Sequence, residues 1–589
     1  MPPQERNNFV TKLCLRTVER SESSTFMKPG LALVLTCAFL PALHAETTPP
    51  ADVTFTGESA GNDFGWRSAP AGDVNGDGVE DLIVGAPSYD GIAGFAGRAY
   101  LFYGPFSGDI NAADADAIIS AQAFGDNLGF SVASAGDVNN DGFDDIVVGA
   151  RSNDANGIQS GRVYLFYGPV NGSLADTDAD AIISGTAFDE VGRSVAGVGD
   201  LNGDGFDDIL IGTDIAGGSF QGQAFLFDGP LFGERDASSA DAIITGSFSN
   251  ESFGAWVASA GDVNNDGVQD IIIGAPRFPL NGADTGRAYI FYGPVAGSMI
   301  ATEADVILFG EQINDGFGRS VASAGDVNGD GVDDIIVGAD ELFNEGTGKA
   351  YVFYGPLAGS IQAADANAIL IGEVAQDLFG VSVSGTGDFN GDGFDDVVIG
   401  AWDNGGGGGR SGRAYAFFGP LTGTIAAADA DFIVTGQAND QLGFSVSGMD
   451  LNGDGLGDLI VGAPQFSDQD PGFAAIYFGS REEASRIRLK PRNPPIVIPP
   501  EGGSFRYDVD VVNESSASRR IDIWVVLNGP GLQRTVVSFS RTLDAGARFH
   551  RTFIQTIPGS VSAGTYTVVG NAGTFPTPET SDQFTFDKL

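Results

Sequence analysis

The chain has 589 residues, including 87 glycines and 27 prolines, and a formal net charge of -48 at pH 7. This charge argues against nucleic acids and anionic membrane surfaces as partners, because binding to either requires basic patches. The glycine and proline content, beside 42% hydrophobic residues, favours many short strands separated by turns. We therefore expect an all-β protein whose acidic groups attract cations.

The N-terminal region, residues 1–45, has the pattern of a secretory signal. A basic residue follows Met27, then comes the apolar run LALVLTCAFLPALHA, which ends at the small residue Ala45. We expect translation to begin at Met27 and cleavage to follow Ala45, which would make the protein secreted or displayed at the cell surface. The exported chain would have no disulfide, because both cysteines precede the cleavage point: Cys14 and Cys37.

A nine-residue acidic pattern, Asp-x-Asn-x-Asp-Gly-x-x-Asp, recurs at steps of 62 to 64 residues. This period is too long for one helical hairpin and fits one four-stranded blade of a propeller. The seven copies begin at Asp73, Asp137, Asp200, Asp262, Asp326, Asp388 and Asp450.

Each repeat offers four strand candidates around its acidic loop. The run after the loop, such as LIVGAP, does not alternate in polarity, which indicates a strand covered on both faces. The closing segment of a repeat occurs once before the first loop and is not recognisable after the seventh. We therefore expect Asp52–Gly57 to complete the seventh blade and close the ring. Residues 51–480 are thus predicted to form a seven-bladed β-propeller of four-stranded blades closed by an N-terminal strand.

A second unit is predicted after the propeller. Residues 481–500 include KPRNPPIVIPP, whose proline density is typical of a stiff linker. Residues 501–589 contain strands of period two separated by Gly, Asn and Pro, which favours a C-terminal immunoglobulin-like β-sandwich. This region shows no recognisable ligand motif.

The acidic loops have the ligand pattern of a calcium site. Loop positions 1, 3, 5 and 9 supply carboxylate or amide oxygens, position 7 supplies a carbonyl, and Gly at position 6 allows a sharp bend. An EF-hand is excluded because the twelfth position is apolar in every loop. A single loop could be an Asx-rich turn without metal, but seven complete copies favour about seven Ca²⁺ ions, one per blade. The predicted ligands are Asp73, Asn75, Asp77, Val79, Asp81, Asp137, Asn139, Asp141, Phe143, Asp145, Asp200, Asn202, Asp204, Phe206, Asp208, Asp262, Asn264, Asp266, Val268, Asp270, Asp326, Asn328, Asp330, Val332, Asp334, Asp388, Asn390, Asp392, Phe394, Asp396, Asp450, Asn452, Asp454, Leu456 and Asp458.

The residues that flank the loops carry a family resemblance. With Phe64–Gly65 before the first loop and Gly85–Pro87 after it, and similar pairs in other repeats, residues 51–480 resemble the FG-GAP repeats of integrin α subunits. The resemblance implies a calcium-binding propeller that takes extracellular ligands on the face opposite its calcium loops, and hence an adhesion or recognition module. The sequence shows no inserted ligand-binding domain and no transmembrane segment, so an integrin heterodimer is not expected.

The alternative function is an extracellular polysaccharide lyase or hydrolase built on a propeller. The only histidines are His44 and His550, so no histidine acid–base pair or triad is expected in the propeller, although Tyr, Lys or Asp chemistry stays open. We therefore expect no enzyme, no catalytic residue and no organic cofactor, and a partner that is an extracellular protein or glycan. Basic residues that recur before the third strand are expected to pair with acidic neighbours: Arg98, Arg162, Arg287, Lys349 and Arg413.

Overall fold

A computed structural model describes most of the chain from residue 49 to the C-terminus. The predicted signal region, residues 1–45, and the start at Met27 lie outside the described residues. In the part that is described, no helix is both long and apolar enough to cross a membrane. The described residues are 49–589 without 91–93, 217–218, 278, 281–282, 342–345, 466–469, 481–484, 493–495, 514–518, 531, 544–546 and 575–576.

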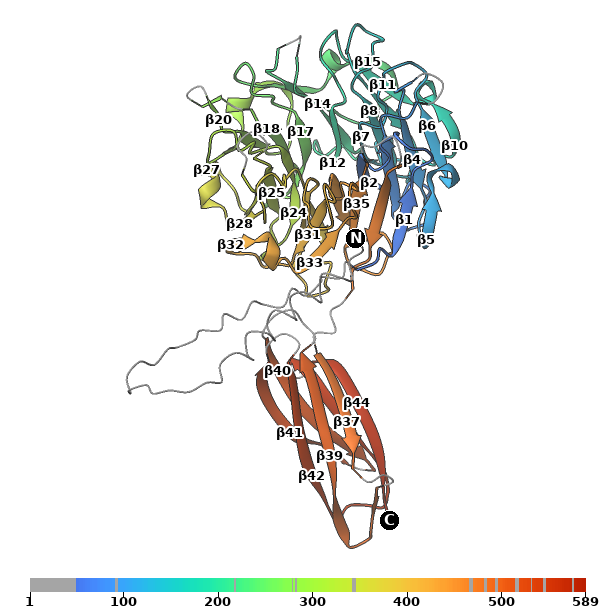
Figure 1. Ribbon diagram of the computed structural model, residues 1–589, viewed down its shortest axis with the longest axis vertical. Helices are drawn as coiled ribbons and strands as arrows, with labels where there is room; N and C mark the ends of the chain where they lie inside the picture. The colour runs from blue at the N-terminus through green and yellow to red at the C-terminus, as the bar shows by residue number, and fades with distance from the viewer. Residues whose placement is uncertain are drawn as a thin grey trace, which may run out of the picture. The chain divides into compact units, whose positions relative to one another are not determined.

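The seven repeats form seven twisted sheets arranged as a seven-bladed β-propeller (Figure 1). In the first repeat the order from the inside outwards is β2 (Arg67–Gly72), β3 (Asp81–Ala86), β4 (Arg98–Phe102) and β6 (Ala117–Ser120). The innermost strands of neighbouring sheets contact one another around the whole ring, and the last of them contacts β2. The prediction of an all-β propeller is therefore confirmed.

The other six repeats follow the same strand order. Their strands are β7 (Ser131–Gly136), β8 (Asp145–Ala150), β9 (Arg162–Phe166) and β11 (Ala181–Ser184); β12 (Ser194–Gly199), β13 (Asp208–Thr213), β14 (Gln223–Phe227) and β16 (Ala242–Thr245); β17 (Trp256–Gly261), β18 (Asp270–Ala275), β21 (Arg287–Phe291) and β23 (Val306–Phe309); β24 (Ser320–Gly325), β25 (Asp334–Ala339), β26 (Lys349–Phe353) and β28 (Ala368–Ile371); β29 (Ser382–Gly387), β30 (Asp396–Ala401), β31 (Arg413–Phe417) and β33 (Phe432–Thr435); and β34 (Ser445–Met449), β35 (Asp458–Ala463) and β36 (Phe473–Tyr477). A short hairpin, β19 (Pro279–Leu280) with β20 (Ala283–Asp284), lies between β18 and β21.

The N-terminal strand closes the ring, as the sequence predicts. Strand β1 (Val53–Thr56) pairs antiparallel with β36, and Val53 lies opposite Ile476. The seventh blade thus takes its fourth strand from the start of the described chain. This pairing covers the edge of β36, which an open array of repeats would leave exposed.

The blades are not limited to four strands, and this corrects the prediction. A short strand from each of six repeats adds in parallel to the outer edge of the preceding blade, as β10 does to β6. Each of these strands begins with two exposed residues and places only one or two residues partly inside, so they lack the continuous apolar pattern by which the other strands are predicted. They are β5 (Gly108–Asn111), β10 (Gly172–Ala175), β15 (Gly233–Asp236), β22 (Gly297–Ile300), β27 (Gly359–Gln362) and β32 (Gly423–Ala426), each followed by a 3₁₀ turn: η2 (Ala112–Asp114), η3 (Asp176–Asp178), η4 (Ala237–Ser239), η5 (Ala301–Glu303), η6 (Ala363–Asp365) and η7 (Ala427–Asp429).

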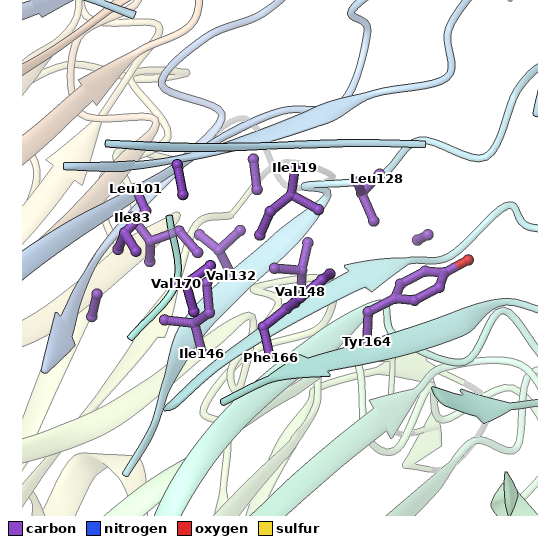
Figure 2. Close-up of a cluster of buried hydrophobic side chains, with 14 of the residues drawn as sticks. Ile83, Leu101, Ile119, Leu128, Val132, Ile146, Val148, Tyr164, Phe166 and Val170 are labelled. Atoms are coloured by element: carbon purple, nitrogen blue, oxygen red, sulfur yellow. The ribbon is translucent and has the colours of Figure 1, made fainter. Parts of the chain in front are cut away.

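The core lies between the blades. Ile83 from the first blade packs in one buried cluster with Ile146 and Phe166 from the second (Figure 2). Its neighbour Val84 points to the other side and packs in a cluster with Ile476 of the seventh blade. Strand β3 is therefore covered on both faces, as its continuous apolar sequence predicts.

The C-terminal residues form two further sheets that share one buried cluster. The three-stranded sheet contains β37 (Ser485–Pro491), β39 (Gly502–Asn513) and β42 (Arg548–Pro558). The buried cluster joins Tyr507 of this three-stranded sheet to Ile523 and Tyr566 of the other sheet, which has five strands. The immunoglobulin-like class of this unit stays a prediction. The five-stranded sheet has the order β38 (Val497–Ile498), β44 (Thr577–Lys588), β43 (Gly564–Thr574), β40 (Arg519–Gly529) and β41 (Leu532–Leu543).

The predicted linker, residues 481–500, contributes strands to both of these sheets. Strand β37 pairs antiparallel with β39, and β38 pairs in parallel with β44. The prolines do not prevent this, because Pro491 ends β37 and the two residues of β38 precede Pro499. Part of the stretch expected to be a spacer is therefore strand.

Candidate metal centres

Each acidic loop joins the innermost strand of a blade to the second strand. In the first loop, the two carboxylate oxygens of Asp73 accept hydrogen bonds from the backbone N–H groups of Asp77 (2.9 Å) and Gly78 (2.8 Å). Gly78 has a φ of 86°, a conformation that other residues rarely adopt, so the sixth position requires glycine. An Oδ1 atom of Asp77 accepts from the N–H of Val79 at 3.0 Å. The same bonds to the first and fifth aspartates recur in the other loops.

The aspartate at the ninth position of each loop is fully buried at the start of the second strand. The carboxylate of Asp81 accepts from the N–H groups of Gly104 (2.9 Å) and Val74 (3.0 Å). Burial raises the pKa of Asp81 to about 7, although the hydrogen bonds from Gly104 and Val74 lower this pKa in part. Burial likewise raises the pKa at the other ninth positions, to about 7 for Asp145, Asp208, Asp334 and Asp458, about 6 for Asp270 and about 8 for Asp396.

The asparagine at the third position has different surroundings in different loops, and five loops show two contrasting arrangements. The Oδ1 atoms of Asn139, Asn264 and Asn390 are buried and have no hydrogen-bond partner among the described residues. In contrast, Oδ1 of Asn202 accepts from the N–H of Asp204 at 2.9 Å, and the seventh loop has the same bond. Buried oxygens normally have a partner, so an acceptor without one fits a site for a cation.

The carboxylates of a loop do not converge on one point in this structure. Across the described ranges, no three carboxylate, imidazole or thiolate side chains lie close enough together to hold a metal ion. The aspartates are instead held by backbone N–H groups. A carboxylate offers about four lone-pair positions. Asp73 and Asp81 each use two of these in the bonds described above, so capacity for a cation remains. The 35 ligands named from the sequence therefore stay a prediction.

A second set of aspartates links neighbouring loops, and the sequence reasoning missed it. Asp144, at the eighth position of the second loop, accepts the N–H of Asp73 at 2.7 Å, and its own N–H donates to the carbonyl of Asp73 at 3.2 Å. The doubled aspartate at positions 8 and 9 of four repeats is the signal that could have revealed this contact. The equivalent side-chain bonds join Asp207 to Asp137, Asp333 to Asp262 and Asp395 to Asp326.

Three of the recurring basic residues have the structural pairing that the sequence predicts. Arg98 lies 2.7 Å from Glu58, Lys349 lies 2.9 Å from Glu311, and Arg413 lies 3.0 Å from Glu373. In each pair the acidic residue follows the closing strand of the preceding segment. These contacts anchor the third strand to the chain that enters its blade.

Comparison with known proteins identifies the repeats. The FG-GAP repeat family model matches seven segments: residues 64–102, 128–166, 191–227, 253–291, 317–353, 379–417 and 442–477. Each segment contains one acidic loop with the strands on both sides of it.

Curated relatives match parts of the chain. Integrin alpha pat-2 of Caenorhabditis briggsae is 30% identical over 232 residues, which are 37% of this chain and 18% of that protein. Integrin alpha-PS2 of Drosophila melanogaster is 33% identical over 217 residues, 35% of this chain and 15% of that protein. Phosphatidylinositol-glycan-specific phospholipase D of Bos taurus is 31% identical over 227 residues, 36% of this chain and 26% of that protein.

The chain thus spans about a quarter or less of the length of these relatives. Among solved structures, a β-glucosidase of Listeria innocua matches with 20% identity over 18% of this chain and 16% of that chain, at a TM-score of 0.14, which supports no argument. The seven matched repeats, the seven sheets and the integrin α relatives together show that this chain is an FG-GAP repeat protein of the integrin α-like kind.

Proposed function

We propose that this protein is a secreted, calcium-binding FG-GAP β-propeller that acts as an extracellular adhesion or ligand-recognition module. The observation that carries the proposal is the complete set of oxygen ligands in all seven loops, with a buried amide oxygen that lacks a partner in three of them: Asn139, Asn264 and Asn390. Calcium takes six to eight oxygen ligands, and carboxylates, amides and carbonyls supply them.

The loop residues would divide the work of holding the ion. The aspartates at positions 1, 5 and 9 supply negative charge, the asparagine at position 3 supplies a neutral oxygen, and the residue at position 7 supplies its carbonyl. Calcium would offset the mutual repulsion of the aspartates and the burial of the ninth one. Because every loop joins the first two strands of a blade, each ion would fasten the inner part of that blade without a disulfide.

The recognition role is supported by the relatives named as integrin alpha chains, and the role of an enzyme finds little support in the side chains. The described propeller contains no histidine, since His550 lies in β42 of the C-terminal sheets. The proposal of secretion rests on the signal pattern of residues 1–45 in the sequence. The division into a propeller over 51–480, a connecting stretch over 481–500 and a C-terminal sandwich over 501–589 belongs to the same proposal.

Calcium binding is tested by counting the bound metal by mass spectrometry and by measuring unfolding in millimolar calcium and after chelation. At free calcium tenfold above each dissociation constant, each site adds about 1.4 kcal/mol to the free energy of unfolding, and seven sites add about 10 kcal/mol. We expect about seven ions and a large loss of stability on chelation. Absence of bound calcium together with an unchanged melting curve would refute the proposal.

Two matched asparagine variants sharpen the test. Asn264→Ala removes an oxygen without a partner, so it should leave stability unchanged in chelator and remove one ion in calcium. Asn202→Ala also removes a backbone hydrogen bond, so it should lower stability under both conditions. If Asn264→Ala and Asn202→Ala changed the stability and the number of bound ions by the same amounts, both in calcium and in chelator, Asn264 would hold no metal.

A further inference from the structure

A cavity opens at the mouth of the propeller, at the end of the innermost strands remote from the acidic loops. Strand β2 begins at Arg67 and ends next to the first loop, so Arg67 lies at the far end of that strand. The cavity has a volume of about 260 Å³. Its lining includes three of the four tryptophans of the chain: Trp66, Trp256 and Trp402.

Two of the lining residues break the symmetry of the repeats. The second position after the Phe-Gly pair is serine in five repeats but Arg67 in the first and Trp256 in the fourth. Where serine is present it commonly bonds to the next blade, as Ser131 does through its hydroxyl to the carbonyl of Gly192 at 2.8 Å. The first and fourth blades lack this serine, and their replacements meet across the mouth, with Cζ of Arg67 5.7 Å from the Trp256 ring.

Four guanidinium groups line the mouth, and among the described residues three of them pair with a carboxylate. Of the four arginines that line the cavity, three have ion pairs: Arg151 with Glu190 (3.6 Å), Arg193 with Asp214 (3.3 Å) and Arg319 with Asp340 (3.4 Å). Arg67 has no carboxylate within ion-pair distance among the residues that are described. Burial, and then the charges of Arg319 and Arg193, lower the pKa of Arg67 to about 10. A bound carboxylate would compensate this charge through a bidentate contact.

The aromatic lining favours a ring-shaped ligand. Trp66 packs between Phe130 and Phe444, at 5.3 and 4.8 Å between ring centroids, and remains partly exposed to the cavity. The indole of Trp66 lies beside Arg67, the one lining guanidinium for which the described residues offer no carboxylate partner. This pair matches a pyranose ring that carries one carboxylate, since the C–H face of the sugar packs on the aromatic ring. The side chain of an acidic peptide would leave these aromatic surfaces unused. The net charge of -48 also disfavours a polyanion.

We infer that the mouth of the propeller binds a single acidic sugar residue of the uronic acid class, with Arg67 holding its carboxylate and Trp66 packing on its ring, while Arg67, Arg193 and Arg319 already cover the Trp256 ring. This inference rests on the proposed recognition role and names the chemistry of the ligand. The symmetry break at Arg67 and Trp256 is the feature that carries it, because the other blades show that the fold itself accepts serine at this position.

The test is a titration of the full calcium-loaded protein with sodium glucuronate, followed by tryptophan fluorescence and calorimetry. Glucose, which has the same ring without a carboxylate, should bind at least about tenfold more weakly, because the charge-assisted contact is lost. Arg67→Ser introduces the residue of five other blades and should abolish glucuronate binding while leaving melting and the calcium count unchanged. Arg277→Ser, at an exposed arginine that does not line the cavity, should leave binding unchanged.

Several results would overturn the inference. They are equal binding of glucose and glucuronate, no binding of glucuronate at millimolar concentration, unchanged affinity in Arg67→Ser, or tighter binding of a triglutamate peptide than of glucuronate. If Arg67→Ser did not fold, the comparison of the two sugars on the unaltered protein would decide the question. A normal calcium count with no glucuronate binding would refute this inference and leave the calcium-binding propeller intact, so the two failures are distinguishable.

Discussion

Removal of one aromatic ring from the closing strand should weaken the whole propeller. Phe55 of β1 is fully buried, and its ring lies 4.7 Å from that of Phe102 and 5.4 Å from that of Phe106. Phe55→Ala loses the transfer energy of the side chain and leaves a cavity, which together cost about 3 to 5 kcal/mol in buried positions. We expect a loss of this size in the free energy of unfolding of the propeller.

The assay is urea unfolding in calcium, followed by tryptophan fluorescence, to which Trp66, Trp256 and Trp402 of the propeller contribute beside Trp524 of β40. Phe124→Ala is the matched control, because Phe124 is 74% exposed and its loss should change stability by less than about 0.5 kcal/mol. A loss below about 1 kcal/mol for Phe55→Ala would mean that β1 does not hold the ring closed, and that the first and seventh blades associate by other contacts.

Changes of pH, and changes to the aspartates and ion pairs of the propeller, should also alter its stability. Without calcium, the raised pKa of Asp81, about 7, means that the folded state holds its proton more tightly than the unfolded chain. Stability should therefore fall as pH rises from about 4 to 7, and calcium should reverse this trend, as melting curves across that range would show. Asp144→Ala should lower the free energy of unfolding by about 1.5 to 3 kcal/mol in urea titrations, because the N–H of Asp73 loses a charged acceptor. The equivalent position of the seventh loop is Gly457, which has no carboxylate to lose. Gly457→Ala should therefore lower stability only because the added methyl group would overlap the carbonyl oxygen of Thr386. Glu373→Gln should cost about 1.5 to 3 kcal/mol by weakening its contact with Arg413, and thermal melts that match those of the unaltered protein would contradict this.

The sequence predicts the ring and its closure because the residues that form them repeat. The apolar runs after each loop, such as that of β3, have no polar alternation, and only a strand buried between two blades satisfies such a pattern. The closing role of β1 follows from a count of the fourth-strand segment that ends each repeat. One copy of this closing segment precedes the first loop, and none is recognisable after the seventh loop.

The features that the sequence does not predict depend on contacts between repeats. Strand β10 is Gly-Ser-Leu-Ala, with Gly172 and Ser173 exposed, so its composition does not mark it as a strand until it lies against β6. The bond from Asp144 to Asp73 spans 71 residues and has no local pattern. Arg67 and Trp256 are visible in an alignment of the repeats, but their meeting across the mouth requires the ring to be closed.

Because of the parallel outer strands, a single repeat of this protein is not a unit that could be exchanged on its own. A segment cut at the boundary between the first and second blades takes β10 away from β6, although β10 belongs in sequence to the second repeat. Duplication, deletion or transplantation of a single repeat therefore damages two sheets rather than one. The shortest segment that contains all strands of a five-stranded sheet extends into the next repeat, so consecutive segments of this kind overlap. Gain or loss of a blade by recombination therefore requires that the neighbouring blade can pair with an outer strand from a different repeat.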